Sequence, residues 1–121
     1  MRDASAYEKQ AQLFQALSHP VRLRILDILA RQEACVCHLT AVLGQRQPYV
    51  SQQLAALREA GLVSDRREGT LIYYRLADDH LARLLDGSKI LAQALDDESL
   101  AFPPIPESAV DGCPCPRCQG A

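Results

Sequence analysis

The sequence lacks any apolar run long enough to cross a membrane. A transmembrane helix needs about 20 consecutive apolar residues, and no stretch of the 121-residue chain approaches that length. The first residues, MRDASAYEKQ, also lack the apolar segment of a secretory signal peptide. No phosphate-binding glycine loop, nucleophile elbow or recognisable pair of catalytic carboxylates is present, so an enzyme is not predicted. We therefore expect a cytoplasmic protein with one domain and no membrane contact.

The chain also lacks the even number of cysteines that a closed disulfide framework uses, because it has five and one would be left over. A cytosolic location keeps cysteines reduced. The cysteines are therefore expected to be thiols. They lie in two groups, Cys35 and Cys37 near the start of the central region and Cys113, Cys115 and Cys118 close to the end of the chain.

The stretch Val36–Leu62 is predicted to form two short helices joined by a tight turn. Apolar residues repeat at helical spacing in both halves, at Leu39, Val42 and Leu43 and then at Val50, Leu54 and Leu57. Gly44 is suited to end the first helix, Pro48 to open the second at its first position, and Gly61 to end it. Amides and a hydroxyl near the start of the second helix are typical of a DNA-reading helix-turn-helix. An ordinary αα-hairpin with a polar face would give the same pattern.

The flanking sequence predicts three more helices and a β-hairpin. Apolar spacing and turn residues indicate helices over Ser5–Leu17, Pro20–Arg31 and Asp78–Leu100, and strands over Leu62–Glu68 and Thr70–Leu76, with residues 32–34 as a plain connection. A hairpin that directly follows a helix-turn-helix is a wing. The predicted fold is therefore mainly α with a small β-hairpin, a winged helix-turn-helix formed by residues 1–100.

The final helix and the residues after it predict two further features. Leucines near heptad spacing occupy the helix, at Leu81, Leu84, Leu91 and Leu95. Because one small domain does not need so many, we predict a homodimer packed through the first and last helices, with coverage of the monomer core as the alternative. Residues 101–121 hold five prolines and two glycines, which predicts a mobile Cys/Pro-rich tail.

The net charge of −2 hides an uneven distribution. Residues 44–76 hold five arginines against three acidic residues, a net charge of +2, whereas residues 77–121 hold three basic and eight acidic residues, a net charge of −5. Positive charge therefore gathers on the helix-turn-helix and the hairpin, where DNA phosphates would be met. An ordinary solvated face is a sufficient explanation for the acidic remainder.

Three stretches together resemble the ArsR/SmtB family of repressors. Ala16–Leu26 is similar to the junction of that family's first two helices, Val50–Val63 to its recognition helix, and Glu68–Leu76 to its wing. The resemblance covers about residues 7–100. It implies a homodimeric winged-helix repressor that binds double-stranded operator DNA and releases it when a metal or another inducer binds. The residues predicted to contact DNA are Gln45, Arg46, Gln47, Tyr49, Ser51, Gln52, Gln53, Arg58, Arg66, Arg67 and Arg75.

Cys35-Val36-Cys37-His38-Leu39 resembles the metal box of the family's thiolate-sensing members. The chemistry of the residues points the same way, because clustered thiolates select soft or borderline ions, namely Cd(II), Pb(II), Hg(II) and As(III), and also Zn(II). Side chains at i and i+2 of an ideal helix diverge by about 200°. For both thiols to bind one ion, Cys35 must therefore precede the helix and Cys37 must lie in its first residues. No organic cofactor is predicted.

The tail adds three thiols within Cys113–Cys118. Two geometries remain open, a mixed site that combines Cys35 and Cys37 with one or two tail cysteines, and a separate three-thiol site in the tail. We prefer the mixed site, because only it couples the ion to the helix-turn-helix. His38 stands where the family usually has an acidic residue; it is a further candidate ligand after the cysteines, but we prefer to interpret it as a solvated residue at the helix start.

The sequence departs from relatives of two kinds. Arsenic-sensing relatives carry a third cysteine where this chain has Thr40. Other relatives hold zinc at the dimer interface, and Asp78-x-His80 matches the first half of that pattern, but the later ligand positions fall on Leu91 and Ala94. We therefore expect neither of these two sites, and we interpret His80 as a surface residue.

Two alternatives keep part of this interpretation. In the first, the thiols serve a redox- or persulfide-sensing repressor of the same fold, through a disulfide between the Cys35–Cys37 pair and the tail. A metal-buffering protein with a degenerate winged helix would bind no specific operator.

Overall fold

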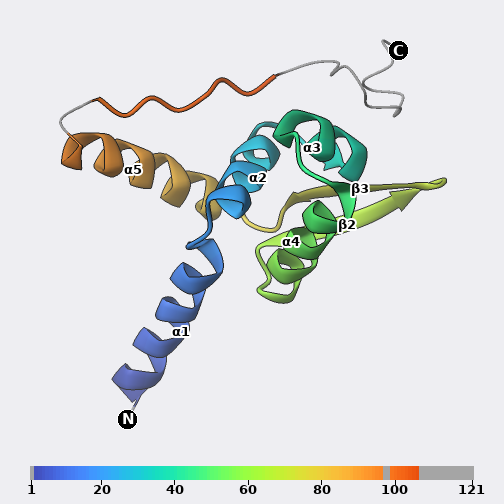
Figure 1. The fold of residues 1–121 in the computed structure, drawn as a ribbon. Helices are drawn as coiled ribbons and strands as arrows, with labels where there is room; N and C mark the ends of the chain where they lie inside the picture. Colours follow the sequence, from blue (N-terminus) through green and yellow to red (C-terminus); the bar gives the residue numbers. More distant parts are fainter. Residues whose placement is uncertain (1, 97–98, 107–121) are drawn as a thin grey trace.

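The computed structural model describes residues 2–96 and 99–106, and it has the predicted winged helix-turn-helix fold. Its elements are α1 (Arg2–Leu17), α2 (Pro20–Arg31), β1 (Ala34–Cys35), α3 (Val36–Leu43), α4 (Gln47–Glu59), β2 (Val63–Glu68), β3 (Leu71–Leu76) and α5 (Asp79–Leu95). Figure 1 shows α2 at the centre, with α3, α4 and the β2–β3 hairpin on one side and α5 on the other. The hairpin extends beyond α4 as a wing.

The core lies where α2, α3 and α4 meet. Its fully buried apolar side chains come from all three helices and include Ile25, Leu26, Ile28, Leu39, Val50, Leu54 and Leu57. Gly44 ends α3 in the left-handed conformation (φ 63°), and its N–H donates to the carbonyl of Thr40 at 3.0 Å. α4 begins at Gln47. Pro48 therefore occupies the second helical position, whereas the sequence predicts the first. The stripe of α4 is therefore fully buried, as the sequence indicates, whereas in the stripe of α3 only Leu39 is buried, and Val42 and Leu43 are half-buried against the core.

Ala34–Cys35 form a short strand where the sequence predicts only a connection. β1 pairs antiparallel with β3, with Ala34 opposite Tyr74 and Cys35 opposite Tyr73. The hairpin strand β2 lies on the other side of β3, so the strand order is β1-β3-β2. Two residues carry no periodic signal, and only the pairing with β3 makes them a strand. The first thiol consequently lies at the edge of the sheet that forms the wing.

α5 ends at Leu95, five residues earlier than predicted. The N–H of Ser99 donates to the carbonyl of Asp96 at 3.2 Å, and the Ser99 hydroxyl donates to the Asp96 carboxylate at 2.7 Å. Such local side-chain bonds compete with helix propagation. At the other end of the chain, α1 begins at Arg2 and not at Ser5.

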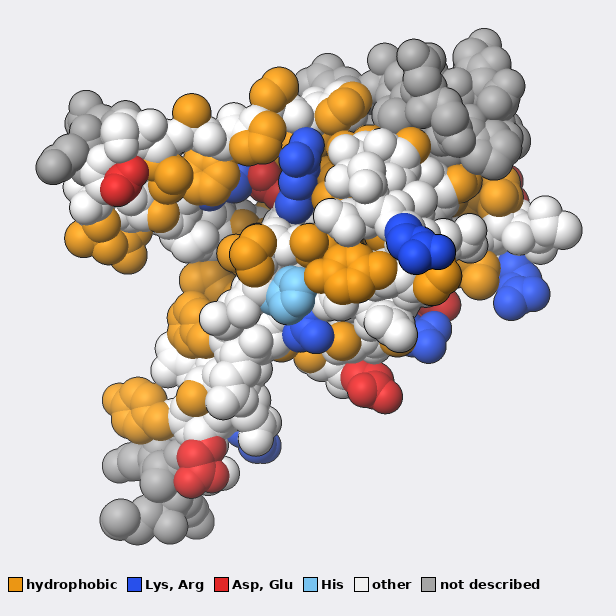
Figure 2. All heavy atoms as spheres, in the orientation of Figure 1, with side chains coloured by type: hydrophobic (Ala, Val, Ile, Leu, Met, Phe, Trp, Pro, Cys, Tyr) orange, Lys and Arg blue, Asp and Glu red, His pale blue; other side chains and the backbone are white. Residues whose placement is uncertain are grey.

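α1 extends away from the body of the molecule and buries little beyond its last turn (Figure 1). Its aromatic residues Tyr7 and Phe14 are 71% and 48% exposed, and on α5 the side chains of Ile90, Leu91 and Leu95 are 68%, 59% and 78% exposed. Figure 2 shows hydrophobic side chains on both protruding helices. The predicted alternative, in which the leucines cover the monomer core, therefore holds for Leu81 and Leu85, which are buried, and for Leu84, which is half-buried and packs against the core.

Candidate DNA interface and thiol site

The start of α4 and the turn before it present most of the predicted DNA-contact residues to solvent. Exposed side chains are Gln45, Arg46, Gln47, Ser51, Gln52 and Arg58. The apolar stripe of α4 faces α2 and α3, so the exposed amides and hydroxyl lie on the remaining face. Amide side chains can pair with adenine edges, and Ser can bond several groups in the major groove. This face has the chemistry that base reading requires.

Gln53 lies on another side of α4 than the sequence interpretation assumed. Its side chain is 8% exposed, and its Oε1 accepts a hydrogen bond of 2.8 Å from Nε of Arg22 in α2. Arg22 also donates to the carbonyl of Ala16 at 3.3 Å. Tyr49 is half-buried, with its ring centroid 6.5 Å from that of His19. Gln53 therefore links α4 to α2 in this structure, and its direct DNA contact stays a prediction.

Gln52 and Gln53 offer a matched pair for separating DNA reading from packing. We expect Gln52→Ala to leave the free energy of unfolding within about 0.5 kcal/mol of wild type and to weaken specific DNA binding by about 1–3 kcal/mol, the size of one base-edge contact. Gln53→Ala should lower the free energy of unfolding by about 1.5–3 kcal/mol, because a buried hydrogen bond from a charged donor is lost. Urea denaturation at one protein concentration and fluorescence anisotropy with duplex DNA measure the two quantities. Equal stability of the variants would contradict the packing role of Gln53.

Arg66 of the wing is held by several partners. Its Nε donates to Glu33 at 3.0 Å, Nη2 donates to the second oxygen of Glu33, and Nη1 donates to Glu68 at 2.7 Å. Its guanidinium carbon lies 4.8 Å from the centroid of the Tyr73 ring. The hydrogen bonds to Glu33, and then those to Glu68, raise the pKa of Arg66 above its ordinary value. Sequence reasoning took Arg66 as a phosphate contact and gave Glu33 no role.

The other predicted arginines of this region are exposed at the protein surface. Arg58 pairs with Asp65 at 3.1 Å, and Nε of Arg75 donates to the hydroxyl of Ser64 at 3.2 Å. Arg67 is exposed on β2. Exposed pairs of this kind contribute little to stability, so these arginines can exchange their partners for DNA phosphates at small cost.

The two central thiols occupy the positions that a shared ion requires. Cys35 is the last residue of β1 and the N-cap of α3, and its Sγ accepts a hydrogen bond of 3.4 Å from the backbone N–H of His38. Cys37 is the second residue of α3. Both belong to one small apolar cluster around Tyr73, in which Cys35 is 2% exposed and Cys37 is half-buried. An N-terminal helix position with an N–H donor stabilises a thiolate.

Cys35 and Cys37 are the only cysteines among the described residues. Cys37 and Thr40 lie three residues apart and so share a face of α3, and the Thr40 hydroxyl is buried with no hydrogen-bond partner among the described residues. A hydroxyl is a poor ligand for soft ions. Within residues 2–96 and 99–106 no group of three His, Cys, Asp or Glu side chains is close enough to hold an ion. The thiol pair therefore fits a soft ion in chemistry and position but needs a third donor, and Cys113, Cys115 and Cys118 lie outside the described residues.

The two histidines near the predicted metal motifs differ in environment. His38 is 6% exposed, so the expectation of a solvated residue at the helix start is wrong. It lies in the first turn of α3, where its backbone N–H donates to Sγ of Cys35. His80 is exposed, as predicted, and its backbone N–H and Nδ1 both bond the carboxylate of Asp78, at 2.8 and 2.7 Å. The backbone hydrogen bond from His80 is the main cause that lowers the pKa of Asp78. This pair caps α5.

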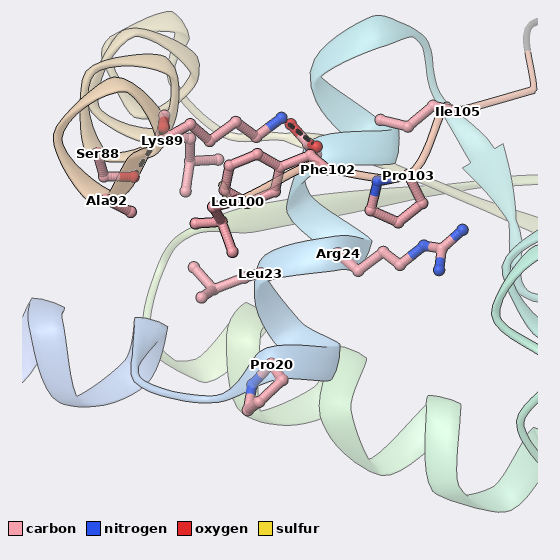
Figure 3. Close-up of a pocket in the computed structure, with 12 residues that line it drawn as sticks. Pro20, Leu23, Arg24, Ser88, Lys89, Ala92, Leu100, Phe102, Pro103 and Ile105 are labelled. Carbon is pink, nitrogen blue, oxygen red and sulfur yellow. Dashed lines mark hydrogen bonds and ion pairs between the residues drawn. The ribbon is translucent and has the colours of Figure 1, made fainter. Parts of the chain in front are cut away.

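The segment Leu100–Ile105 lines a groove of about 500 Å³ between α2 and α5 (Figure 3). Phe102 lies below Lys89, whose Nζ is 5.3 Å from the ring centroid and forms an ion pair with Asp27. Ile105 packs against the core, and in Figure 3 it lies toward the C-terminal end of α2. The chain therefore leaves α5 and runs back across α2 toward α3, as Figure 1 also shows.

The chain has similarities to known regulatory proteins. Residues 19–65 match the model of a family described as bacterial regulatory protein, arsR family. The biofilm growth-associated repressor of Agrobacterium fabrum is 49% identical over 85 residues, which cover 67% of this chain and 73% of that protein. The arsenical resistance operon repressor of Escherichia coli is 46% identical over 67 residues, which cover 54% and 57% of the two chains.

A solved structure agrees with these sequence matches. The homodimeric winged helix-turn-helix DNA-binding domain of Mb0332 from Mycobacterium bovis, studied by NMR in solution, superposes with a TM-score of 0.72 at 35% identity and covers 84% of this chain and 94% of that one. Among the described residues of this chain, no helix combines the length and apolar composition that crossing a membrane requires.

Proposed function

The chain belongs to the ArsR family of bacterial transcriptional regulators, and we propose that it is a homodimeric repressor whose operator is released when cysteine thiolates bind a soft metal ion or metalloid. The family and the relatives named above are regulators of transcription and not enzymes. The observation that carries the proposal is the position of Cys35 and Cys37. They begin the helix-turn-helix itself, one as the N-cap of α3 and the other in its first turn.

DNA binding uses the exposed start of α4 together with the wing. In a symmetric dimer two such helices enter adjacent major grooves about 34 Å apart. The exposed apolar residues of α1 and α5 would form the two-fold interface, which makes residues 1–100 the DNA-binding and dimerisation domain. The relative from M. bovis is homodimeric, which supports a dimer.

The metal is held by Cys35, Cys37 and one or two cysteines of the tail formed by residues 101–121. The direction of the segment Leu100–Ile105 supports this mixed site, because that segment already crosses α2 toward α3. From Pro106 to Cys113 the chain spans seven residues, which reach at most about 25 Å. Thiolate ligands favour Cd(II), Pb(II), Hg(II) or As(III), and also Zn(II), and the similarity to an arsenical resistance repressor favours As(III) among them.

Release of the operator follows from ligation at α3, which is the first helix of the helix-turn-helix. Fixing the tail to this helix favours a dimer geometry that no longer matches two adjacent major grooves. A coupling free energy of about 1–3 kcal/mol is sufficient for a 5- to 150-fold loss of DNA affinity.

A metal titration of the operator complex tests the proposal. The operator is first selected from random duplexes with the metal-free protein, and the complex is then titrated under reducing conditions with Cd(II), Pb(II) and As(III). We expect release at one equivalent of ion per site. Failure to select any specific duplex would support a metal-buffering protein, and a stable complex with all three ions would reject metal-induced release.

Redox sensing is the second candidate function, and one observation favours it. The N–H donor at the Cys35 sulfur stabilises a thiolate, and thiolates are also the form that oxidants and persulfides attack. Release by a mild oxidant, reversed by dithiothreitol and unaffected by chelators, would support this function over metal sensing.

A further inference from the structure

Cys35, Tyr73 and Arg66 form one row across the three-stranded sheet. The strand register pairs Cys35 with Tyr73 on one side of β3, and Arg66 with Tyr73 on the other. Paired residues of neighbouring strands project from the same face. The side chains are accordingly in contact, because Tyr73 shares a buried cluster with Cys35 and its ring carries the Arg66 guanidinium at 4.8 Å. We call these three residues the thiol-to-wing row.

Glu33 connects Arg66 to the chain segment that leads into β1 and Cys35. It lies immediately before β1, and its two carboxylate oxygens accept from Nε and Nη2 of Arg66. A bidentate pair fixes the orientation of both groups as well as their distance. Glu68 holds the same guanidinium at 2.7 Å, but from within β2. The wing arginine is therefore positioned both by its own strand and by the segment that carries the first thiol.

We propose that the thiol-to-wing row transmits metal binding from Cys35 to the wing, an inference that rests on the proposed function. On ligation each thiol releases its proton to solvent as its sulfur bonds the cation. Because Cys35 is 2% exposed and packs against the Tyr73 ring, space for the cation comes from a shift of that ring or of β1. Packed side chains move between discrete arrangements and do not deform continuously. Tyr73 and Glu33 therefore move together, and Arg66 loses the position that they define.

Glu33→Gln tests the transmission, with Glu68→Gln as its matched control. Both variants make the same change beside the same guanidinium, but of the two carboxylates only that of Glu33 lies next to β1. We expect Glu33→Gln to reduce the Cd(II)-induced loss of operator affinity by roughly threefold or more, and Glu68→Gln to keep it within about twofold of wild type. Fluorescence anisotropy with and without Cd(II) measures both. An unchanged response in Glu33→Gln, or an equal reduction in both variants, would overturn the inference.

The NMR resonance of the Arg66 Nε–H reports changes in the thiol-to-wing row in the absence of DNA. The resonance is assigned by its loss in Arg66→Lys. In the metal-free protein we expect this resonance to shift in Cys35→Ser but not in Cys37→Ser, because only Cys35 is paired with Tyr73. In the wild-type protein the resonance should shift when Cd(II) binds. Binding itself is measured by thiolate-to-cadmium charge-transfer absorption. A resonance insensitive to Cys35→Ser overturns the row. If Cd(II) binds the wild-type protein but does not release the operator, both the proposed function and this inference are wrong. If Cd(II) releases the operator but the Arg66 resonance does not change, only the inference is wrong.

Discussion

Cys37→Ser is expected to abolish metal-induced release of the operator. Cys37 is the half-buried thiol of the first turn of α3 and shares its apolar cluster with Cys35. A serine hydroxyl keeps the size of the side chain but is a hard donor that soft ions do not select. With one of the two thiol ligands at the start of α3 lost, the proposed 5- to 150-fold effect of metal on DNA affinity should fall to about onefold.

The metal-free variant should still bind its operator with wild-type affinity, because Cys37 is neither on α4 nor on the hairpin. Thr40→Ser is the matched control, since it alters a side chain on the same face of α3 without removing a thiol. Fluorescence anisotropy with and without Cd(II) gives the affinity ratio for each variant. A wild-type response in Cys37→Ser would reject the mixed site.

A triple serine variant at Cys113, Cys115 and Cys118 distinguishes the two ligand geometries. If the site is mixed, Cys37→Ser alone and the triple variant alone each abolish metal-induced release of the operator. If the ion is held by the tail alone, only the triple variant does so, and Cys37→Ser responds as wild type. Mass spectrometry of the intact complex under native conditions reports whether each variant still holds the ion.

Local chemistry made much of the fold predictable. Gly44 can take a left-handed cap where other residues are strained, and Pro48 suits the first turn of a helix, so both ends of the helix-turn-helix turn could be assigned from sequence. The β-forming residues of the hairpin and the glycine between its two strands likewise predict β2 and β3 within one residue. The position of Cys35 before α3 and of Cys37 in its first turn follows from helical geometry once one shared ion is assumed.

What the sequence could not predict depends on partners far away along the chain. β1 exists because it pairs with β3, and Gln53 is buried because Arg22 reaches it across 31 residues. Arg66 looks like any charged residue of a hairpin until Glu33, 33 positions earlier, is placed beside it. Helical and strand periods describe neighbours in sequence and carry no information on such pairs. The same limit explains the wrong assignment of His38 to the solvated surface.

Aspartate at both Leu91 and Leu95 is expected to convert the proposed dimer to monomers and to remove most of its operator affinity. Both leucines lie on α5 and are 59% and 78% exposed in the single chain. In a symmetric interface each residue meets the same patch of its partner, so every substitution buries two carboxylates. Burying charge without a partner carries a large free-energy cost.

The expected loss of operator affinity is about 10²- to 10⁴-fold, because a monomer contacts one half-site without the effective concentration that linkage supplies. Sedimentation velocity reports the mass, and anisotropy reports the affinity for a full operator and for a single half-site. Asp86→Ala, which changes an exposed residue of the same helix without adding a charge, should alter neither. The half-site affinity of the double variant should equal that of wild type, because its α4 and wing are intact. A folded double variant that remains dimeric would show that α5 is not the interface, and the exposed apolar side chains of α1 would then have to form it alone.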